Sequence, residues 1–142
     1  MIEVYTDGSC LKNSGGSPGG WAFIMIINDI NWSYSTEYHV SGNNSNTTNN
    51  RMELQAVIEA LSFVIEEVID VRSKYRIYTD SKLTLHCAKR EWKRNANLDL
   101  WEIYDAVSKG KEIEWIWVKA HNGNNYNEMV DKLARDSAKS IY

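Results

Sequence analysis

Four acidic residues interrupt apolar patterns in this chain, at Asp7, Glu53, Asp80 and Asp131. Asp7 ends one strand-like run, and Asp80 ends a second run of nearly the same sequence. Glu53 and Asp131 lie at the edges of the apolar stripes of two predicted helices. A half-buried carboxylate is costly unless it is paired or binds a metal. Together, the four groups are suited to hold two hard divalent cations, and such a pair of cations can cleave or transfer phosphodiesters.

The size and composition are those of one soluble globular domain. The chain has 142 residues, 43% hydrophobic and 25% charged, so it can bury a core without disulfides. We therefore expect a single domain over residues 1–142. We expect no membrane partner, because no segment has the length of a membrane span and the first residues read as a strand instead of a signal peptide.

Two cysteines, Cys10 and Cys87, have no metal-binding spacing, and although they could pair, they favour a reducing, cytoplasmic setting. The net charge of −3 argues mildly against a nucleic-acid partner. That argument weakens if the acids cluster, because two bound divalent cations would make the sum positive.

The first part of the chain predicts three strands in an antiparallel meander. Alternating apolar residues predict strands over 2–7, 21–27 and 32–40. We expect the glycine-rich segment 8–20 to form a long turn, and Asn28-Asp29 to join the second and third strands.

The middle part of the chain predicts a long helix, a strand and a short helix. Residues 41–47 are expected to be a polar loop, and Thr48 is expected to cap a helix. Apolar residues then repeat with a period of 3.6, at positions 54, 57, 58, 61, 64, 65 and 68. A strand at 75–79 precedes a short helix that begins near Ser81.

The last part predicts a helix, a strand and a helix. Asn97 is expected to cap a helix that ends at Gly110, with Trp101 on its apolar stripe. A fifth strand contains Ile113, Trp115 and Trp117, whose spacing assigns both tryptophans to the core. The final helix starts at about Asn127, and its expected buried residues are Met129, Val130, Leu133, Ala134 and Ala138.

The resulting order, βββαβααβα, predicts an α/β fold: a mixed five-stranded sheet with helices on its faces. Ligands of such sheets lie at the carboxyl ends of the parallel strands. If the strands ending at Asp7 and Asp80 are parallel neighbours in register, one metal can bridge both acids. Each acid also has a plainer interpretation. Asp7 and Asp80 suit turns or caps, Glu53 suits a helix surface, and Asp131 suits an ion pair with Arg135.

Four strings resemble type 1 ribonuclease H, in order and over nearly the whole chain. They are Tyr5-Thr-Asp-Gly-Ser-Cys10, Thr48-Asn-Asn-Arg-Met-Glu-Leu54, Tyr78-Thr-Asp-Ser81, and Trp117-Val-Lys-Ala-His-Asn-Gly123 with Asn127-Glu-Met-Val-Asp-Lys-Leu-Ala134. The resemblance implies a ribonuclease H-like fold, with the RNA strand of an RNA–DNA hybrid as substrate and Mg²⁺ as cofactor.

The resemblance also assigns roles to residues. Asp7, Glu53, Asp80 and Asp131 match the four metal-binding acids of the family, and His121 matches its loop histidine, a helper in proton transfer or product release. Two Mg²⁺ ions are implied, with Mn²⁺ as a possible substitute, and the implied products carry 5′-phosphate and 3′-hydroxyl ends. The expected substrate-binding residues are Ser9, Cys10, Asn13, Thr48, Asn49, Asn50, Ser81, Trp92 and Asn97.

Several of these contacts have a chemical reason. Asn13, Asn49 and Asn50 match positions that face the minor groove, where an amide can both donate to and accept from a 2′-hydroxyl. Thr48 and Asn97 match positions that hold a phosphate of the DNA strand.

Two departures from the family pattern concern the substrate. Lys82 stands where many members have glutamine. We therefore expect Lys82 to contact a phosphate in place of the minor-groove contact of that glutamine. The segment between Asp80 and Trp101 is too short for the basic handle of some members, and a reduced version remains at 89–94 around Trp92. Two interpretations of 89–94 stay open: Trp92 stacks on a sugar while its basic neighbours attract phosphate, or the segment is only a solvated helix end. We expect weak hybrid affinity.

Three other functions remain open: a non-catalytic hybrid-binding module, the ribonuclease H portion of a reverse transcriptase, and a DNA nuclease of related fold. The intact acids and His121 favour an enzyme. Because Met1 opens directly on the first strand, we expect an independent protein, a monomer without an obligate protein partner.

Overall fold

The computed structural model describes residues 1–12, 16–29, 34–63, 74–119 and 125–140. These residues form a five-stranded sheet in the order β3-β2-β1-β4-β5, together with four helices. The strands are β1 Ile2–Cys10, β2 Ser17–Asp29, β3 Tyr34–Thr47, β4 Lys74–Thr79 and β5 Glu112–Trp117. The helices are α1 Asn49–Ser62, α2 Lys82–Ala88, α3 Leu98–Ser108 and α4 Asn125–Lys139. The predicted order and the mixed sheet are confirmed.

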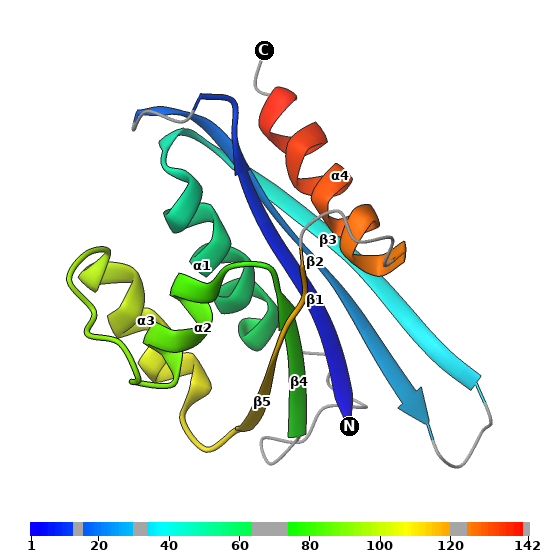
Figure 1. Ribbon diagram of the computed structural model, residues 1–142. Coiled ribbons are helices and arrows are strands. Elements are labelled where there is room, and N and C mark those ends of the chain that lie inside the picture. Colours follow the sequence, from blue (N-terminus) through cyan, green and yellow to red (C-terminus); the bar gives the residue numbers. More distant parts are fainter. Residues whose placement is uncertain (13–15, 30–33, 64–73, 120–124, 141–142) are drawn as a thin grey trace.

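Helices cover both faces of the sheet (Figure 1). Helices α1, α2 and α3 lie on one face, where Val4, Phe23 and Ile77 belong to the larger apolar core. Helix α4 lies on the other face, where Val130 and Ala134 belong to a smaller core. None of the helices in the described ranges combines the length and the apolar character needed to cross a bilayer.

Strands β1 and β4 are parallel neighbours, and Tyr5 is paired with Tyr78. Both tyrosines stand two residues before an acid, so the register brings Asp7 and Asp80 to the same end of the two strands. The condition stated above for one metal to bridge both acids, parallel pairing in register, is therefore met. Strands β1, β2 and β3 form the predicted antiparallel meander, and β5 adds to β4 in parallel.

Two predicted turns are wrong. In the segment 8–20, β1 continues to Cys10 and β2 already begins at Ser17, with Cys10 paired to Gly19. Asn28 and Asp29 do not form a turn, because they continue β2 and pair with β3. In both places, backbone pairing with a neighbouring strand outweighs the turn preference of the local residues.

The predicted polar loop at 41–47 is also wrong, because β3 runs to Thr47. This polar stretch pairs with the glycine-rich start of β2, and Asn43 lies opposite Gly20. Trp21 lies opposite Gly42 and its ring covers this glycine so closely that a Cβ there would overlap it. Residues 41–47 lack alternating apolar residues, so the sequence did not indicate a strand there. Backbone pairing with β2 holds this part of β3 in the sheet.

The helix starts are mostly as predicted. Thr48 caps α1 by accepting a hydrogen bond from the Arg51 N–H, and Ser81 caps α2 in the same way. Asn97 precedes α3 in a left-handed conformation, φ 58°, but its side chain makes no cap bond. The apolar positions 64, 65 and 68 predicted for the long helix lie outside the described residues.

Among the aromatic and apolar residues assigned to the core, Trp101 is buried as predicted. Met129 and Trp117 are exposed by 40% and 43%, so their assignment to the core is wrong. Trp117 sits at the last position of β5.

Candidate metal centre

Three carboxylates from distant parts of the chain meet at one end of the sheet. Asp7, Glu53 and Asp80 each place one oxygen so that all three oxygens lie within 4.8 Å of one another. Asp7 and Glu53 are buried, with exposures of 2% and 6%, and Asp80 is partly buried. Three convergent carboxylate oxygens are the ligands that a hard divalent cation prefers.

The fold explains how these three side chains meet. Asp7 lies in β1 and Asp80 directly follows the parallel neighbour β4. Glu53 lies in the second turn of α1, and the backbone of α1 at this point rests on Gly8. A Cβ at Gly8 would overlap the backbone nitrogen of Glu53, so glycine permits the helix to approach the strand at the position next to Asp7.

Burial and mutual repulsion disfavour the charged forms of these acids. Burial is the main cause that raises the pKa of Asp7 from 3.8 to about 8, and the charge of Asp80 adds to it. Burial, and then the charges of Asp7 and Asp80, raise the pKa of Glu53 well above its usual value. Without a cation, the cluster therefore retains protons at neutral pH, and a cation would compete with those protons.

One oxygen of Glu53, Oε2, is buried, and no group of the described residues forms a hydrogen bond with it. Asp7 Oδ1, in contrast, accepts a hydrogen bond of 2.9 Å from the Gly8 N–H. A buried carboxylate oxygen without a donor is costly, and a divalent cation would satisfy it. The donor set and this unpaired oxygen both fit a metal site.

Asp131 lies beside the three-carboxylate cluster, on α4. It is close enough to Asp7 to raise the pKa of that residue. Its own carboxylate accepts a hydrogen bond of 2.9 Å from Arg135 Nε, the ion pair that the plainer interpretation predicted. Helix α4 approaches the sheet at Gly20, where a Cβ would lie 2.7 Å from the backbone nitrogen of Ala138.

The predicted phosphate contacts Thr48 and Asn97 are linked by Arg51. The Arg51 N–H donates to Thr48 Oγ1, and the Arg51 guanidinium donates to Asn97 Oδ1 at 3.3 Å. Two further bonds, of 3.0 and 2.7 Å, join the guanidinium to Asp99. The sequence reasoning missed Arg51 in this group, although its position in the matched string Thr48–Leu54 was a signal.

The other predicted substrate residues come from several elements. Ser9 and Cys10 end β1, and Asn49 and Asn50 are exposed in the first turn of α1. The Ser81 hydroxyl is engaged locally by Thr84, through its cap bond. Asn13 and His121 lie outside the described residues.

The basic segment 89–94 is largely paired with acids. Arg94 binds Asp105 through two bonds of 2.9 Å and lies over the ring of Trp101, with only 7% of its side chain exposed. Arg90 also pairs with Asp105. Trp92 is 46% exposed and stacks on His86 at 4.3 Å, so it presents an aromatic surface to solvent.

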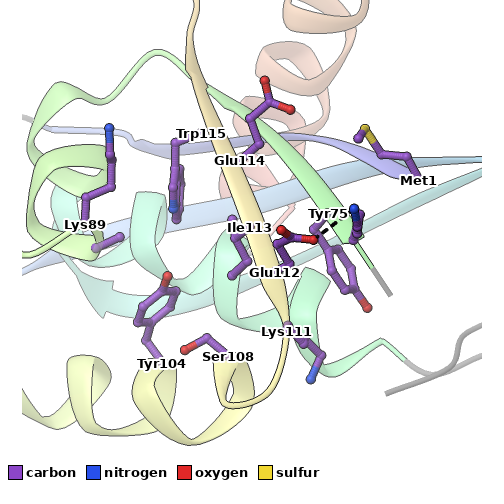
Figure 2. Close-up of a pocket in the computed structure, with 12 residues that line it drawn as sticks. Met1, Tyr75, Lys89, Tyr104, Ser108, Lys111, Glu112, Ile113, Glu114 and Trp115 are labelled. Carbon is purple, nitrogen blue, oxygen red and sulfur yellow. Dashed lines mark ion pairs between the residues drawn. The ribbon is translucent and has the colours of Figure 1, made fainter. Parts of the chain in front are cut away.

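An open hollow of about 670 Å³ lies elsewhere, along β5 and beside α3 (Figure 2). Tyr104, Ile113 and Trp115 line it, and the ion pair between Lys74 and Glu112 lies at its side. None of the four acids lines this hollow, so it is separate from the candidate metal centre.

The chain matches the family model described as RNase H over residues 1–139. The chain belongs to the RNase H family. It is accordingly a hydrolase of the ribonuclease H type, and the four strings of its sequence lie in the fold that they implied.

Relatives of this family are similar over nearly their whole length. A ribonuclease H of Campylobacter jejuni strain 81-176 is 42% identical over 148 residues, which cover 99% of this chain and 92% of the relative. A ribonuclease H of Treponema denticola is 38% identical and is covered to 98%.

Solved RNase H structures share the fold. LC9-RNase H1, described as a type 1 RNase H with the type 2 active-site motif, has a TM-score of 0.84 and 31% identity, and the match covers 99% of this chain and 73% of that one. LC11-RNase H1 in complex with an RNA/DNA hybrid has a TM-score of 0.77 over 99% of both chains. Its identity of 17% supports a common fold alone.

Proposed function

We propose that this protein is an endoribonuclease that cleaves the RNA strand of RNA–DNA hybrids and leaves 5′-phosphate and 3′-hydroxyl ends. The observation that carries the proposal is the convergence of Asp7, Glu53 and Asp80 within 4.8 Å, in a chain of the RNase H family. The relatives named ribonuclease H support the substrate class.

The cofactor of this proposal is Mg²⁺, two ions with substrate bound, and Mn²⁺ is a plausible replacement. Asp7, Glu53 and Asp80 would hold the ions, with Asp131 as the fourth acid. When bound, the two ions supply Lewis acidity that activates the attacking water and stabilises the leaving 3′ oxygen.

The residues of the chain have three tasks in this reaction. The buried carboxylates Asp7 and Glu53 give up their retained protons and present oxygens at fixed positions, because β1 and α1 are in direct contact at Gly8. Asp131 contributes negative charge from the opposite helix layer. His121 would shuttle a proton or assist product release, as the resemblance implies.

Substrate recognition would use the polar residues around the carboxylates. Asn49 and Asn50 are exposed at the start of α1, where their amides can bond 2′-hydroxyl groups of the RNA strand. Thr48 and Asn97, joined by Arg51, would bind a phosphate of the DNA strand. The remaining proposed contacts are Ser9, Cys10, Asn13, Ser81 and Trp92.

We further propose that the protein acts as a single domain and as a monomer, inside the cell. The two cysteines are free, Cys87 is buried and Cys10 is partly buried, which suits a reducing compartment. A mass measurement in solution tests the monomer.

A panel of labelled duplexes tests the proposed activity. We expect Mg²⁺-dependent cleavage of an RNA–DNA hybrid, loss of cleavage with chelator, and no cleavage of double-stranded DNA or RNA of the same sequence. Cleavage of double-stranded DNA would favour a DNA nuclease instead. Hybrid binding without any cleavage, in Mg²⁺ and in Mn²⁺, would favour a non-catalytic binding module.

A further inference from the structure

Three tyrosine rings from three different elements stack on the face of the sheet that α4 covers. The rings of Tyr5 in β1 and Tyr78 in β4 are stacked and nearly parallel, with centroids 4.2 Å apart and an interplanar angle of 4°. Tyr126, in the first turn of α4, stacks on the ring of Tyr5 with centroids 5.1 Å apart. We call these three residues the tyrosine stack.

Hydrogen bonds hold the outer rings of the tyrosine stack. The Tyr78 hydroxyl donates to Glu3 Oε2 at 2.7 Å, and the Tyr126 hydroxyl donates to Glu37 of β3. Glu37 is also paired with His39. The stack therefore ties α4 to β1, β3 and β4.

The tyrosine stack lies directly beneath the acids. Tyr5 and Tyr78 each precede an acid, Asp7 or Asp80, by two residues, and residues two apart share a face of the sheet about 7 Å from each other. The third ring, Tyr126, starts the helix that carries Asp131, five residues later. Each of the three rings thus lies in the element that contains, or in the case of Asp80 directly precedes, one of the acids.

The far half of α4 has its own anchors on the sheet. Ser137 Oγ donates to the Gly42 carbonyl at 2.7 Å, and Asn43 Nδ2 donates to the Ser137 carbonyl at 3.1 Å. Ala134 and Ala138 lie against Gly20. These contacts fix the C-terminal half of α4 on the sheet. The contact of Tyr126 with Tyr5 then determines how closely the first turns of α4 approach β1. Asp131 lies between Tyr126 and the contacts of the C-terminal half.

We propose that the tyrosine stack is a positioning device that holds Asp131 at a set distance from Asp7 and Asp80, and thereby sets the divalent-cation affinity of the site. This inference rests on the proposed metal-dependent function. The cluster of possible metal ligands contains no residue of the stack, so we assign the three tyrosines as positioning residues. Their effect should appear in metal affinity and kcat, and little in the KM for the hybrid.

Tyr126 is the residue to change, because it is only partly buried and its loss should leave the core intact. Tyr126→Ala removes the ring, whereas Tyr126→Phe keeps the ring and removes the bond to Glu37. Tyr38→Ala is a matched control, because it removes a ring that packs on Phe63 of the opposite layer, 5.5 Å away. Two readouts need no activity: calorimetric titration with Mn²⁺, and hydrogen exchange of the amides at 125–131.

For Tyr126→Ala we expect Mn²⁺ affinity to fall about 10-fold, as when a supporting residue of a metal ligand is removed, and exchange at 125–131 to quicken. Tyr126→Phe should bind Mn²⁺ nearly as the wild type does, and Tyr38→Ala should lower Tm without changing Mn²⁺ affinity. Unchanged Mn²⁺ affinity in Tyr126→Ala would overturn the inference, as would equal defects in Tyr126→Ala and Tyr126→Phe. If the wild type itself fails to cleave hybrid, the proposed function fails, independently of these titrations.

Discussion

The backbone of Glu53 lies against Gly8 so closely that any Cβ on Gly8 would overlap the Glu53 nitrogen. This contact between α1 and β1 places the buried carboxylate of Glu53 next to that of Asp7. A glycine, with no functional group of its own, thus determines the spacing of two charged groups that repel each other. A substitution at Gly8 tests whether this contact sets the spacing of Asp7 and Glu53.

Gly8→Ala should push α1 away from β1. We expect the free energy of unfolding to fall by about 1–3 kcal/mol through overpacking. We also expect Mn²⁺ affinity to fall about 10-fold or more, because the carboxylates separate. Gly42→Ala is the control, since its Cβ would overlap the ring of Trp21, away from the acids. It should lose stability and keep metal binding, and a Gly8→Ala protein with full metal affinity would contradict this account of the spacing.

The metal-free protein should become less stable as the pH rises. Asp7 has a pKa of about 8 in the folded protein and 3.8 as its ordinary value, so the folded state binds the proton more tightly. The free energy of unfolding therefore falls between about pH 4 and pH 8. Asp7→Asn should flatten this dependence and stabilise the protein by on the order of 1–2 kcal/mol near pH 8.

Urea unfolding with chelator at pH 5 and pH 8 measures this effect. Asp136→Asn serves as the control, because Asp136 is an exposed acid in an i,i+4 pair with Lys132. The same pH slope in the wild type and in Asp7→Asn would show that Asp7 does not retain a proton.

Arg94 and Lys93 should have different roles, although they are adjacent and both basic. Arg94 is buried over Trp101 and bound to Asp105, so Arg94→Met should cost about 3 kcal/mol of stability. Lys93 is exposed, so Lys93→Ala should instead weaken hybrid binding and reduce the salt slope of affinity by about 1. Chemical unfolding and hybrid titration at several salt concentrations separate the two, and weaker hybrid binding by a stable Arg94→Met protein would reverse the assignment.

Lys82 should bind a backbone phosphate. It starts α2 two residues after Asp80, and its Nζ lies 4.5 Å from the ring centroid of Trp117, whose Nε1 donates to the Asp80 carbonyl. Lys82→Gln should reduce the salt slope of hybrid affinity by about 1, whereas Lys82→Arg should preserve it. Equal slopes for the wild type and Lys82→Gln would show that the cation makes no phosphate contact.

The sequence predicted those parts of the fold that depend on local periodicity. The side-chain caps Thr48 and Ser81 were correct because a cap bond is local. The parallel pairing of β1 and β4 was only a condition in the sequence argument, and the structure meets it. Strands at 8–10 and 41–47 were missed, because their backbones are held by partners that local composition does not show. The same holds for Arg94, which lies between α2 and α3 and whose partner Asp105 is 11 residues away on α3.

Prediction of the candidate site from the sequence was limited in the same way, to features that do not depend on contacts between distant segments. Residue types and motif strings identified Asp7, Glu53 and Asp80, which the structure brings together. The sequence could not show that Gly8 sets their spacing or that Arg51 links Thr48 to Asn97, because these contacts join segments far apart in the chain.

Anomalous diffraction from a crystal grown with Mn²⁺ tests the central claim most directly. The account predicts an anomalous peak among the carboxylates of Asp7, Glu53 and Asp80, with metal–oxygen distances of about 2–2.3 Å. It predicts no peak at that place in crystals of Asp7→Asn grown in the same way. A wild-type crystal in which Mn²⁺ binds elsewhere and leaves these three carboxylates without a peak would contradict it.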